Sequence, residues 1–259
     1  MTFSSALTST PVVLLPGMMC DDRLFAFQTE QLRKDSQNAV KLYIPQLVYG
    51  SSMPELAQYL LAELPSSFCL CGLSMGGILA MEIVTQAPYR VERLALMDTN
   101  PLAETKEGVA RRNRQIYDVK AGKLRQVIAE EMKPHYLADS LDKQSHLNLC
   151  MDMAVSLGDN AFINQSMALR DRPDQTDTLR AVRCPTLLLH GREDRLCPPE
   201  RHHLMQEFIP HARLVEIDGA APRSAHDYLQ AFFGLAALLA PIKMSLGYLP
   251  LLAPHPPSR

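Results

Sequence analysis

Short apolar runs alternate along this 259-residue chain with longer stretches of helical periodicity, and this alternation sets the class of fold. The strand-like runs lie at 12–15, 40–44, 68–73, 94–97, 186–189 and 214–217. Helical stretches lie between most of them, at 24–33, 54–64, 76–86, 200–208 and 228–239. Strands that alternate with helices require crossover connections. The sequence therefore predicts an α/β fold with a mostly parallel central sheet flanked by helices.

The alternation breaks between residues 101 and 183, where no good strand run occurs. Leu124, Val127, Ile128 and Met132 follow a helical spacing and form an amphipathic stripe, and 152–169 has the pattern of one or two further helices. We expect one domain over 1–259, with a helical cap at 101–183 that covers a mostly apolar site. The proline-rich tail at 241–259 is expected to be irregular.

Composition removes several functional classes. Hydrophobic residues make up 47% of the chain and charged residues 21%, which is ordinary for a globular protein and unlike a disordered one. Lys and Arg number 26 and Asp and Glu 28, so the net charge of −2 gives no footprint for nucleic acid. No membrane span and no secretory signal are expected, which favours the cytoplasm. The six cysteines have no metal-ligand spacing, so we expect buried thiols and no metal.

The segment Gly72-Leu-Ser-Met-Gly76 carries the chemistry. A strand run leads into it and a helix leads out, which is the context that the nucleophile elbow G-x-S-x-G requires. The glycines allow a sharp turn that exposes the hydroxyl of Ser74 above the sheet. The alternative is a plain strand-to-helix turn in which Ser74 caps the helix. We interpret Ser74 as a nucleophile.

A serine nucleophile needs a base and an acid that orients the base. Asp194 follows the end of a strand run and is the predicted acid, with Asp98 in reserve. The alternative for Asp194 is a carboxylate that caps a loop. An oxyanion hole needs backbone N–H groups, and we expect these from Met75, after the nucleophile, and from Met18, in the loop after the first strand.

These segments resemble the α/β-hydrolase fold of esterase and lipase-like serine hydrolases over about residues 10 to 217. The matching residues are those of the elbow and of 13–17, 20–24, 92–96 and 191–194, with a weaker likeness near Arg172. The resemblance implies a sheet of up to eight strands with a helical cap, and no cofactor. Because only 11 residues precede the first strand run, the family's early strands are expected to be missing.

The resemblance also places a catalytic histidine in the loop after 214–217, and there the chain departs from the family. Pro222 occupies the expected position, and the nearest histidine is His226. Three interpretations stay open. The loop is rearranged and His226 is the base; or the triad is broken; or the reading frame shifted near Ala221. Of the other histidines, His190 is expected to be packed or at the surface, and His202 and His203 to lie on a solvated helix face.

The sequence thus predicts a serine hydrolase that cleaves a small carboxylic ester or related acyl substrate through Ser74, His226 and Asp194. One alternative is a lyase or C–C bond cleaving enzyme on the same frame. Another is a catalytically impaired or ligand-binding protein, which Pro222 favours. Dehalogenases and epoxide hydrolases of this fold use an aspartate at the elbow, so Ser74 argues against them. The sequence identifies neither the substrate nor the oligomeric state.

Overall fold

The computed structural model describes residues 10–36, 40–132, 143–192, 194 and 196–217. Its strands are β1 (Val12–Leu15), β2 (Leu42–Tyr43), β3 (Phe68–Leu73), β4 (Val91–Met97), β5 (Thr186–Gly191) and β6 (Arg213–Ile217). Its α-helices are α1 (Ala26–Asp35), α2 (Met53–Glu63), α3 (Met75–Gln86), α4 (Lys106–Lys120), α5 (Leu124–Val127), α6 (Lys143–Arg170), α7 (Thr176–Ala181) and α8 (Pro199–Phe208). Short 3₁₀ turns η2 (Asp22–Phe25) and η3 (Pro88–Arg90) and a π-helical turn η4 (Ile128–Met132) complete the described elements.

The six strands form one sheet in the order β2-β1-β3-β4-β5-β6, and every pairing is parallel. This confirms the predicted α/β class with a mostly parallel central sheet. Strand β3 has the predicted bounds, whereas the run at 40–44 forms only the two-residue edge strand β2. The predicted helix at 228–239 and the tail at 241–259 lie outside the described residues.

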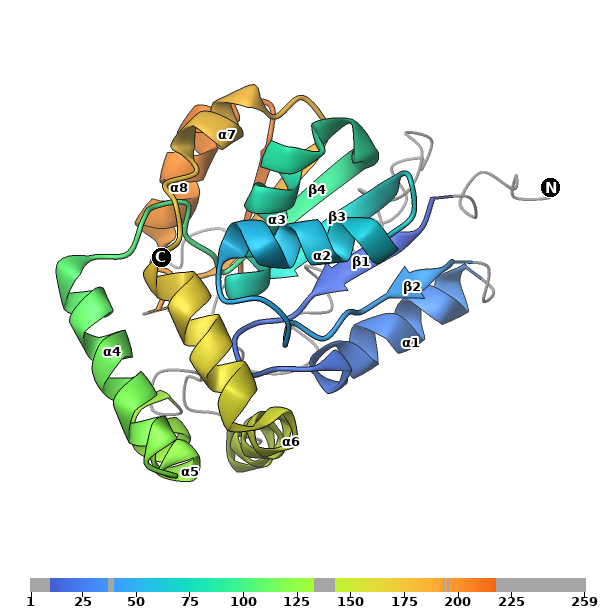
Figure 1. The fold of residues 1–259 in the computed structure, drawn as a ribbon. Helices are drawn as coiled ribbons and strands as arrows, with labels where there is room; N and C mark the ends of the chain where they lie inside the picture. Colours follow the sequence, from blue (N-terminus) through green and yellow to red (C-terminus); the bar gives the residue numbers. More distant parts are fainter. Residues whose placement is uncertain (1–9, 37–39, 133–142, 193, 195, 218–259) are drawn as a thin grey trace, which may run out of the picture.

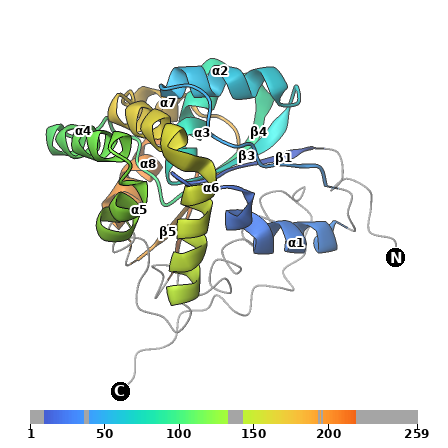
Figure 2. The ribbon, with the colours of Figure 1, turned by 60° about the horizontal axis from the view of Figure 1, so that its bottom comes forward.

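Side chains alternate between two apolar layers, one on each face of the sheet. Leu70, Leu94 and Leu188 point to the face covered by α2, α3, α7 and α8. Cys71, Ala95 and Leu189 point to the other face, where α1 contributes a buried leucine. Figure 2 shows α1 on the opposite side of the sheet from α2 and α3. Because both faces are covered, the central strands are apolar throughout their length.

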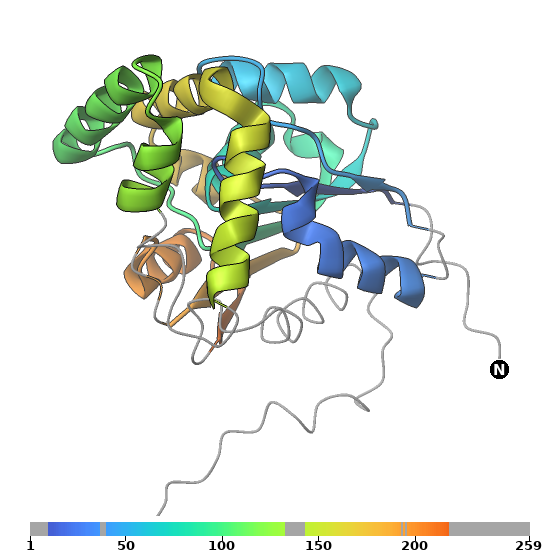
Figure 3. The same ribbon diagram turned by 90° about the horizontal axis from the view of Figure 1, so that it is seen from below.

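The described residues of 101–132 and 143–183 are mostly helical, and α4, α5 and α6 gather at one end of the sheet (Figure 1). The predicted stripe is buried here: Leu124, Val127 and Ile128 pack with Phe162 of α6, and Met132 packs against them. Helix α6 starts earlier than the predicted 152–169 and departs from helical geometry at Gly158, whose φ is 79°. Figure 3 shows α6 running past the sheet between α5 and α1. No helix in the described ranges is long and apolar enough to cross a membrane.

Candidate active site

Ser74 lies at the turn between β3 and α3, with φ 55° and ψ −114°. A non-glycine residue in this region of the backbone map is held there at a cost by its surroundings. Its amide donates to the carbonyl of Met97 at 2.9 Å, and its carbonyl accepts from the Thr99 hydroxyl at 2.7 Å. These bonds tie the predicted nucleophile to the end of β4. Thr99 was not predictable from the sequence, since only the folded sheet brings it to Ser74.

Two glycines make this turn possible. A Cβ atom on Gly72 would overlap the carbonyl of Gly76, and one on Gly76 would overlap the carbonyl of Leu15 at the end of β1. The strand, the helix and β1 therefore approach too closely for any side chain. The amides of Met75 and Gly76 begin α3 and have no acceptor one turn earlier in that helix, whereas those of Gly77 and Ile78 donate to the carbonyl of Ser74.

The loop after β1 lies beside Ser74. A Cβ atom on Gly17 would be 3.7 Å from the Cβ of Ser74. The amide of Met19 donates to Gln165 Oε1 of α6 at 2.8 Å, so this amide is already used. Met18, the residue before it, packs partly against the apolar clusters on both the sheet side and the cap side. The structure therefore places the loop that carries Met18 beside Ser74, and the role of Met18 and Met75 as oxyanion donors stays a prediction.

The two candidate acids follow β4, the neighbour of β3, and β5, one strand further, at the same end of the sheet. Asp98, with φ 39°, ends β4 and accepts the amide of Gly191 at 3.0 Å, which couples β4 to β5. Asp194 follows β5, and its Oδ1 accepts the amides of Leu196 at 2.7 Å and Cys197 at 3.0 Å. These bonds fix Oδ1 of the Asp194 carboxylate, and they also fit the loop-capping alternative.

The predicted base, His226, and Pro222 lie outside the described residues. Of the other histidines, His202 contradicts the expectation of a solvated face, because it is fully buried against the sheet. Its Nε2 accepts the amide of Thr99 at 3.3 Å. Burial first, and then the rings of His190 and His203, lowers the pKa of His202 to about 3. It is therefore neutral at physiological pH and supports the residue that holds Ser74. His203 is exposed as expected.

All six cysteines are free thiols. Cys197 lies near both acids, and burial, followed by the charges of Asp194 and Asp98, raises the pKa of its thiol well above the usual range. A thiol that stays protonated at neutral pH is a poor nucleophile. Ser74 is therefore the better candidate at this end of the sheet.

A buried ion cluster links the start, the first helix and the end of the predicted cap, residues 101–183, and was not foreseen from the sequence. Glu104 Oε2 lies 2.8 Å from Arg112 Nε of α4 and 2.8 Å from Arg172 Nη1 after α6. Arg112 also lies 3.8 Å from the sulfur of Met18. Burial alone would raise the pKa of Glu104, but the hydrogen bonds and charges of the two arginines outweigh it and lower the pKa to about 2. The cluster therefore fixes the cap beside the loop that is predicted to bind the oxyanion.

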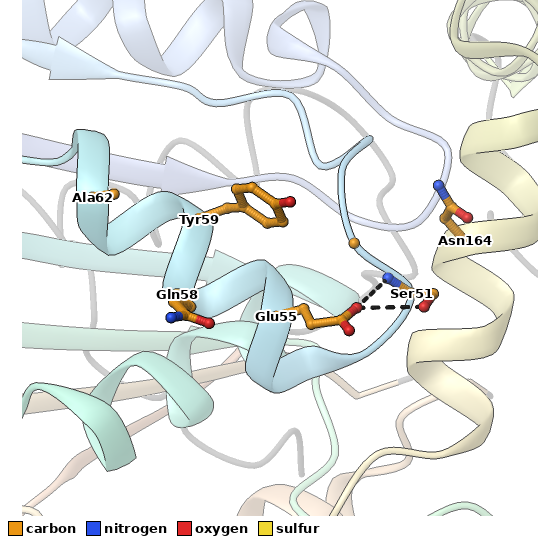
Figure 4. A pocket seen from close by; sticks show the side chains of 7 residues that line it. Ser51, Glu55, Gln58, Tyr59, Ala62 and Asn164 are labelled. Carbon is orange, nitrogen blue, oxygen red and sulfur yellow. Dashed lines mark hydrogen bonds between the residues drawn. The ribbon is translucent and has the colours of Figure 1, made fainter.

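A hollow of about 590 Å³ lies away from these residues, between α2 and α6 (Figure 4). Its walls include Glu55 and Tyr59 of α2 and Asn164 of α6. Glu55 Oε2 accepts the amide of Ser51 at 2.9 Å, so this carboxylate binds the backbone just before α2. None of the lining residues is a predicted site residue, and we do not assign the hollow to catalysis.

Comparison with known proteins agrees with this arrangement. The family model described as serine aminopeptidase, S33 matches residues 55–221, so the match ends directly before Pro222. The chain is 28% identical to a pimeloyl-acyl-carrier-protein methyl ester esterase of Nitrosomonas europaea over 185 residues, covering 63% of this chain and 68% of the relative. It is 26% identical to a protein of the same name from Aromatoleum aromaticum over 198 residues, covering 68% and 76%. A solved structure of a thermophilic esterase from Thermogutta terrifontis superposes with a TM-score of 0.78 at 25% identity, covering 90% of this chain and 91% of that one.

Proposed function

The chain belongs to the serine aminopeptidase S33 family of α/β hydrolases, and from this premise we propose that it cleaves a small carboxylic ester through an acyl-enzyme on Ser74. Its relatives and its structural neighbours include esterases, which makes it a carboxylic ester hydrolase-like protein. The observation that carries the assignment to Ser74 is its backbone, held at φ 55° between β3 and α3. A serine at a plain helix cap would have no need of this geometry.

The proposed reaction has two halves. Ser74 Oγ attacks the ester carbonyl while His226 accepts its proton, and the amides of Met18 and Met75 bind the oxyanion. The C–O bond of the ester breaks, the alcohol leaves with the proton from the imidazolium, and the acyl group stays on Ser74. Water then attacks the acyl-enzyme while His226 takes its proton, the bond between the acyl carbon and Ser74 Oγ breaks, and the imidazolium returns the proton to Oγ as the carboxylic acid leaves. Asp194 orients the imidazole and balances its charge.

The proposed substrate is an ester with a small alkoxy group and a largely apolar acyl part. Two relatives are named for the methyl ester of a carrier-bound acyl chain, which supports a short alkyl leaving group. The apolar cluster of the cap packs against Met18 and Met19, which supports the role of residues 101–183 as a cap over the site. The free thiols support our placement of the protein in the cytoplasm.

A catalytically impaired protein is the second candidate. Its support is Pro222, which stands where the family's histidine is expected, and the end of the family match at residue 221. Without a base, the oxyanion donors and binding alone give about 10³–10⁴-fold acceleration over water in a related triad enzyme. Such a chain would bind an ester and turn it over very slowly.

Labelling with a fluorophosphonate, together with hydrolysis of a short p-nitrophenyl ester, tests both candidates. The variants are Ser74→Ala, His226→Ala and Asp194→Asn, with Ser67→Ala as the matched control. Ser67 precedes β3 and pairs with Glu92 at the opposite end of the strand, about 20 Å from Ser74. We expect labelling of the wild type and of Ser67→Ala, none of Ser74→Ala, and slow labelling of His226→Ala.

The outcomes separate the candidates. An unlabelled wild type with no ester turnover would refute covalent catalysis and favour the impaired protein. Equal labelling of His226→Ala and wild type would remove His226 as the base. We expect Asp194→Asn to lose more turnover than Asp98→Asn, and the opposite order would transfer the acid role to Asp98.

A further inference from the structure

His190 and Glu216 are direct neighbours across the sheet. The parallel register of β5 and β6 pairs His190 with Glu216, two residues beyond the pair Leu188 and Leu214. Both leucines belong to the apolar layer on the α8 side, so alternation directs His190 and Glu216 to that face as well. Helix α8 packs on both strands and brings His203 over this pair.

The ring of His190 presents a lone pair to the Glu216 carboxylate. Its Nδ1 lies 3.3 Å from the carbonyl oxygen of Gly191, which can only accept, so we assign the proton to Nδ1. In the neutral ring Nε2 then has no proton. It is buried, without a hydrogen-bond partner among the described residues, and lies 3.7 Å from Glu216 Oε2. Two acceptors that face each other repel unless a cation lies between them.

Both groups make further hydrogen bonds that orient them, as metal ligands usually do. Glu216 Oε1 accepts from Arg192 Nε at 2.8 Å and Nη2 at 2.6 Å, which directs Oε2 toward His190. A ligating histidine commonly donates its second N–H to a backbone carbonyl, as His190 does, and ligating carboxylates are themselves hydrogen-bonded. The hydrogen bonds that orient His190 and Glu216 are therefore all made by groups of the protein itself.

His203 supplies a third donor. Its ring stands nearly perpendicular to that of His190, at 86° with the centroids 5.9 Å apart. One ligand atom from each of His190, His203 and Glu216 lies within 4.8 Å of the others. A tetrahedral zinc with bonds of about 2.1 Å needs donors about 3.4 Å apart. The exposed side chain of His203 has only to rotate to close the difference.

We propose that His190 Nε2, His203 and Glu216 Oε2 bind one divalent transition-metal ion of the Zn²⁺ class, with water completing the coordination. Two imidazoles and one carboxylate suit such an ion better than Mg²⁺ or Ca²⁺, which prefer oxygen ligands. The site departs from the expectation that the chain binds no metal. Its ligands come from β5, β6 and α8, so it lies at both ends of the loop that carries Asp194. The proposal does not depend on the chemistry proposed for Ser74.

The test starts from protein stripped with a chelator and dialysed. Calorimetric titration with Zn²⁺ is expected to give one ion per chain, and Mg²⁺ no binding. Zn²⁺ at about a hundredfold excess over Kd should raise Tm by about 5–10 °C. His203→Gln and Glu216→Gln should each weaken binding at least tenfold. His211→Gln, an exposed histidine bonded to the Cys184 carbonyl, is the matched control and should bind as the wild type does.

Cobalt distinguishes this site from the free thiols. Co²⁺ bound by two histidines and a carboxylate shows d–d bands without a thiolate charge-transfer band, and an intense charge-transfer band would overturn the proposal. So would the absence of saturable binding, which would leave an imidazolium–carboxylate contact, or equal affinity in both ligand variants and the wild type. Both substituted residues are solvent-exposed, and circular dichroism checks that each variant is folded.

Discussion

The buried cluster of Glu104, Arg112 and Arg172 allows a quantitative test of how the helices of 101–183, the predicted cap, are held together. Glu104→Gln keeps the shape of the side chain and removes the negative charge between two guanidinium groups. The side chains of Glu104, Arg172 and Arg112 are 8%, 5% and 14% exposed, so water cannot take over the lost role. Two like charges would then face each other in a poorly solvated space.

The expected loss of stability follows from the pKa of the Glu104 carboxyl group. Its pKa falls from 4.5 to about 2, and at about 1.36 kcal/mol per pH unit this corresponds to about 3 kcal/mol of stability at neutral pH. Breaking one partner of a buried ion pair typically costs about 3–5 kcal/mol, which agrees. We therefore expect Glu104→Gln to lose about 3 kcal/mol and about 6–12 °C in Tm.

The same group predicts the pH dependence. Because the pKa of Glu104 is lower in the folded state, its contribution is fully present above pH 4.5 and is lost as the pH falls toward about 2. Glu104→Gln lacks this contribution at every pH. The difference in unfolding free energy between wild type and variant should therefore shrink, at pH 3, to less than about half its value at pH 7.

Urea unfolding followed by far-UV circular dichroism measures this difference, since the chain has no tryptophan to report by fluorescence. Glu107→Gln, an exposed residue in the first turn of α4, is the control and should stay within about 0.5 kcal/mol of the wild type. A loss below about 1 kcal/mol in Glu104→Gln, or a gap that is equal at pH 7 and pH 3, would refute the reasoning.

Three further predictions concern the turn at Ser74 and the cap. Gly76→Ala forces a methyl group against the Leu15 carbonyl, and should cost about 1–3 kcal/mol in urea unfolding and lower the rate of fluorophosphonate labelling. Thr99→Val removes the hydroxyl that donates to the Ser74 carbonyl, and should cost about 1 kcal/mol and reduce kcat for ester hydrolysis more than it raises KM. Thr105→Ala removes the side-chain cap of α4 and should cost about 1 kcal/mol without changing the labelling rate.

Each of these has an outcome that contradicts it. Gly122→Ala is the control for Gly76→Ala, because a Cβ on Gly122 meets no atom within 4 Å and only its positive φ is strained. Equal labelling rates in these two glycine variants would show that crowding at Gly76 does not position Ser74. A Thr99→Val protein with wild-type kcat would separate Thr99 from the nucleophile. Slower labelling in Thr105→Ala would mean that the start of α4 also positions the site.

The strands were predictable where burial is complete and poorly predictable where it is not. Every residue of β3 except the last is buried, so its apolar run has the bounds of the strand. Strand β4 begins three residues before the run at 94–97, because Glu92 and Arg93 interrupt the apolar pattern although Val91 and Arg93 still pair with β3. Helix α6 starts at Lys143 rather than 152, and its first turn, residues 143–146, is polar throughout, so no apolar pattern marks the start.

The site was predictable from the chain only in part. The elbow is local in sequence, so Gly72, Ser74 and Gly76 could be identified from a strand, a turn and a helix. Thr99 could not, because its contact with Ser74 depends on the register of two strands. His202 was expected to be solvated because charged neighbours surround it in sequence, yet the turn of α8 directs it onto β5. Tertiary packing decides such positions.

The side chain of Gln165, in α6, connects two segments that follow strands β1 and β2. Its carboxamide accepts the amide of Met19 and donates to the carbonyl of Leu47 at 2.8 Å each, so one side chain of α6 holds both the loop after β1 and the segment after β2. Lifting that part of α6 would break both bonds at once and release the loop that flanks Ser74. A ligand that displaced this part of α6 would therefore also release the loop that is proposed to bind the oxyanion. Bending at Gly158 would move the first part of α6 and leave both hydrogen bonds of Gln165 in place.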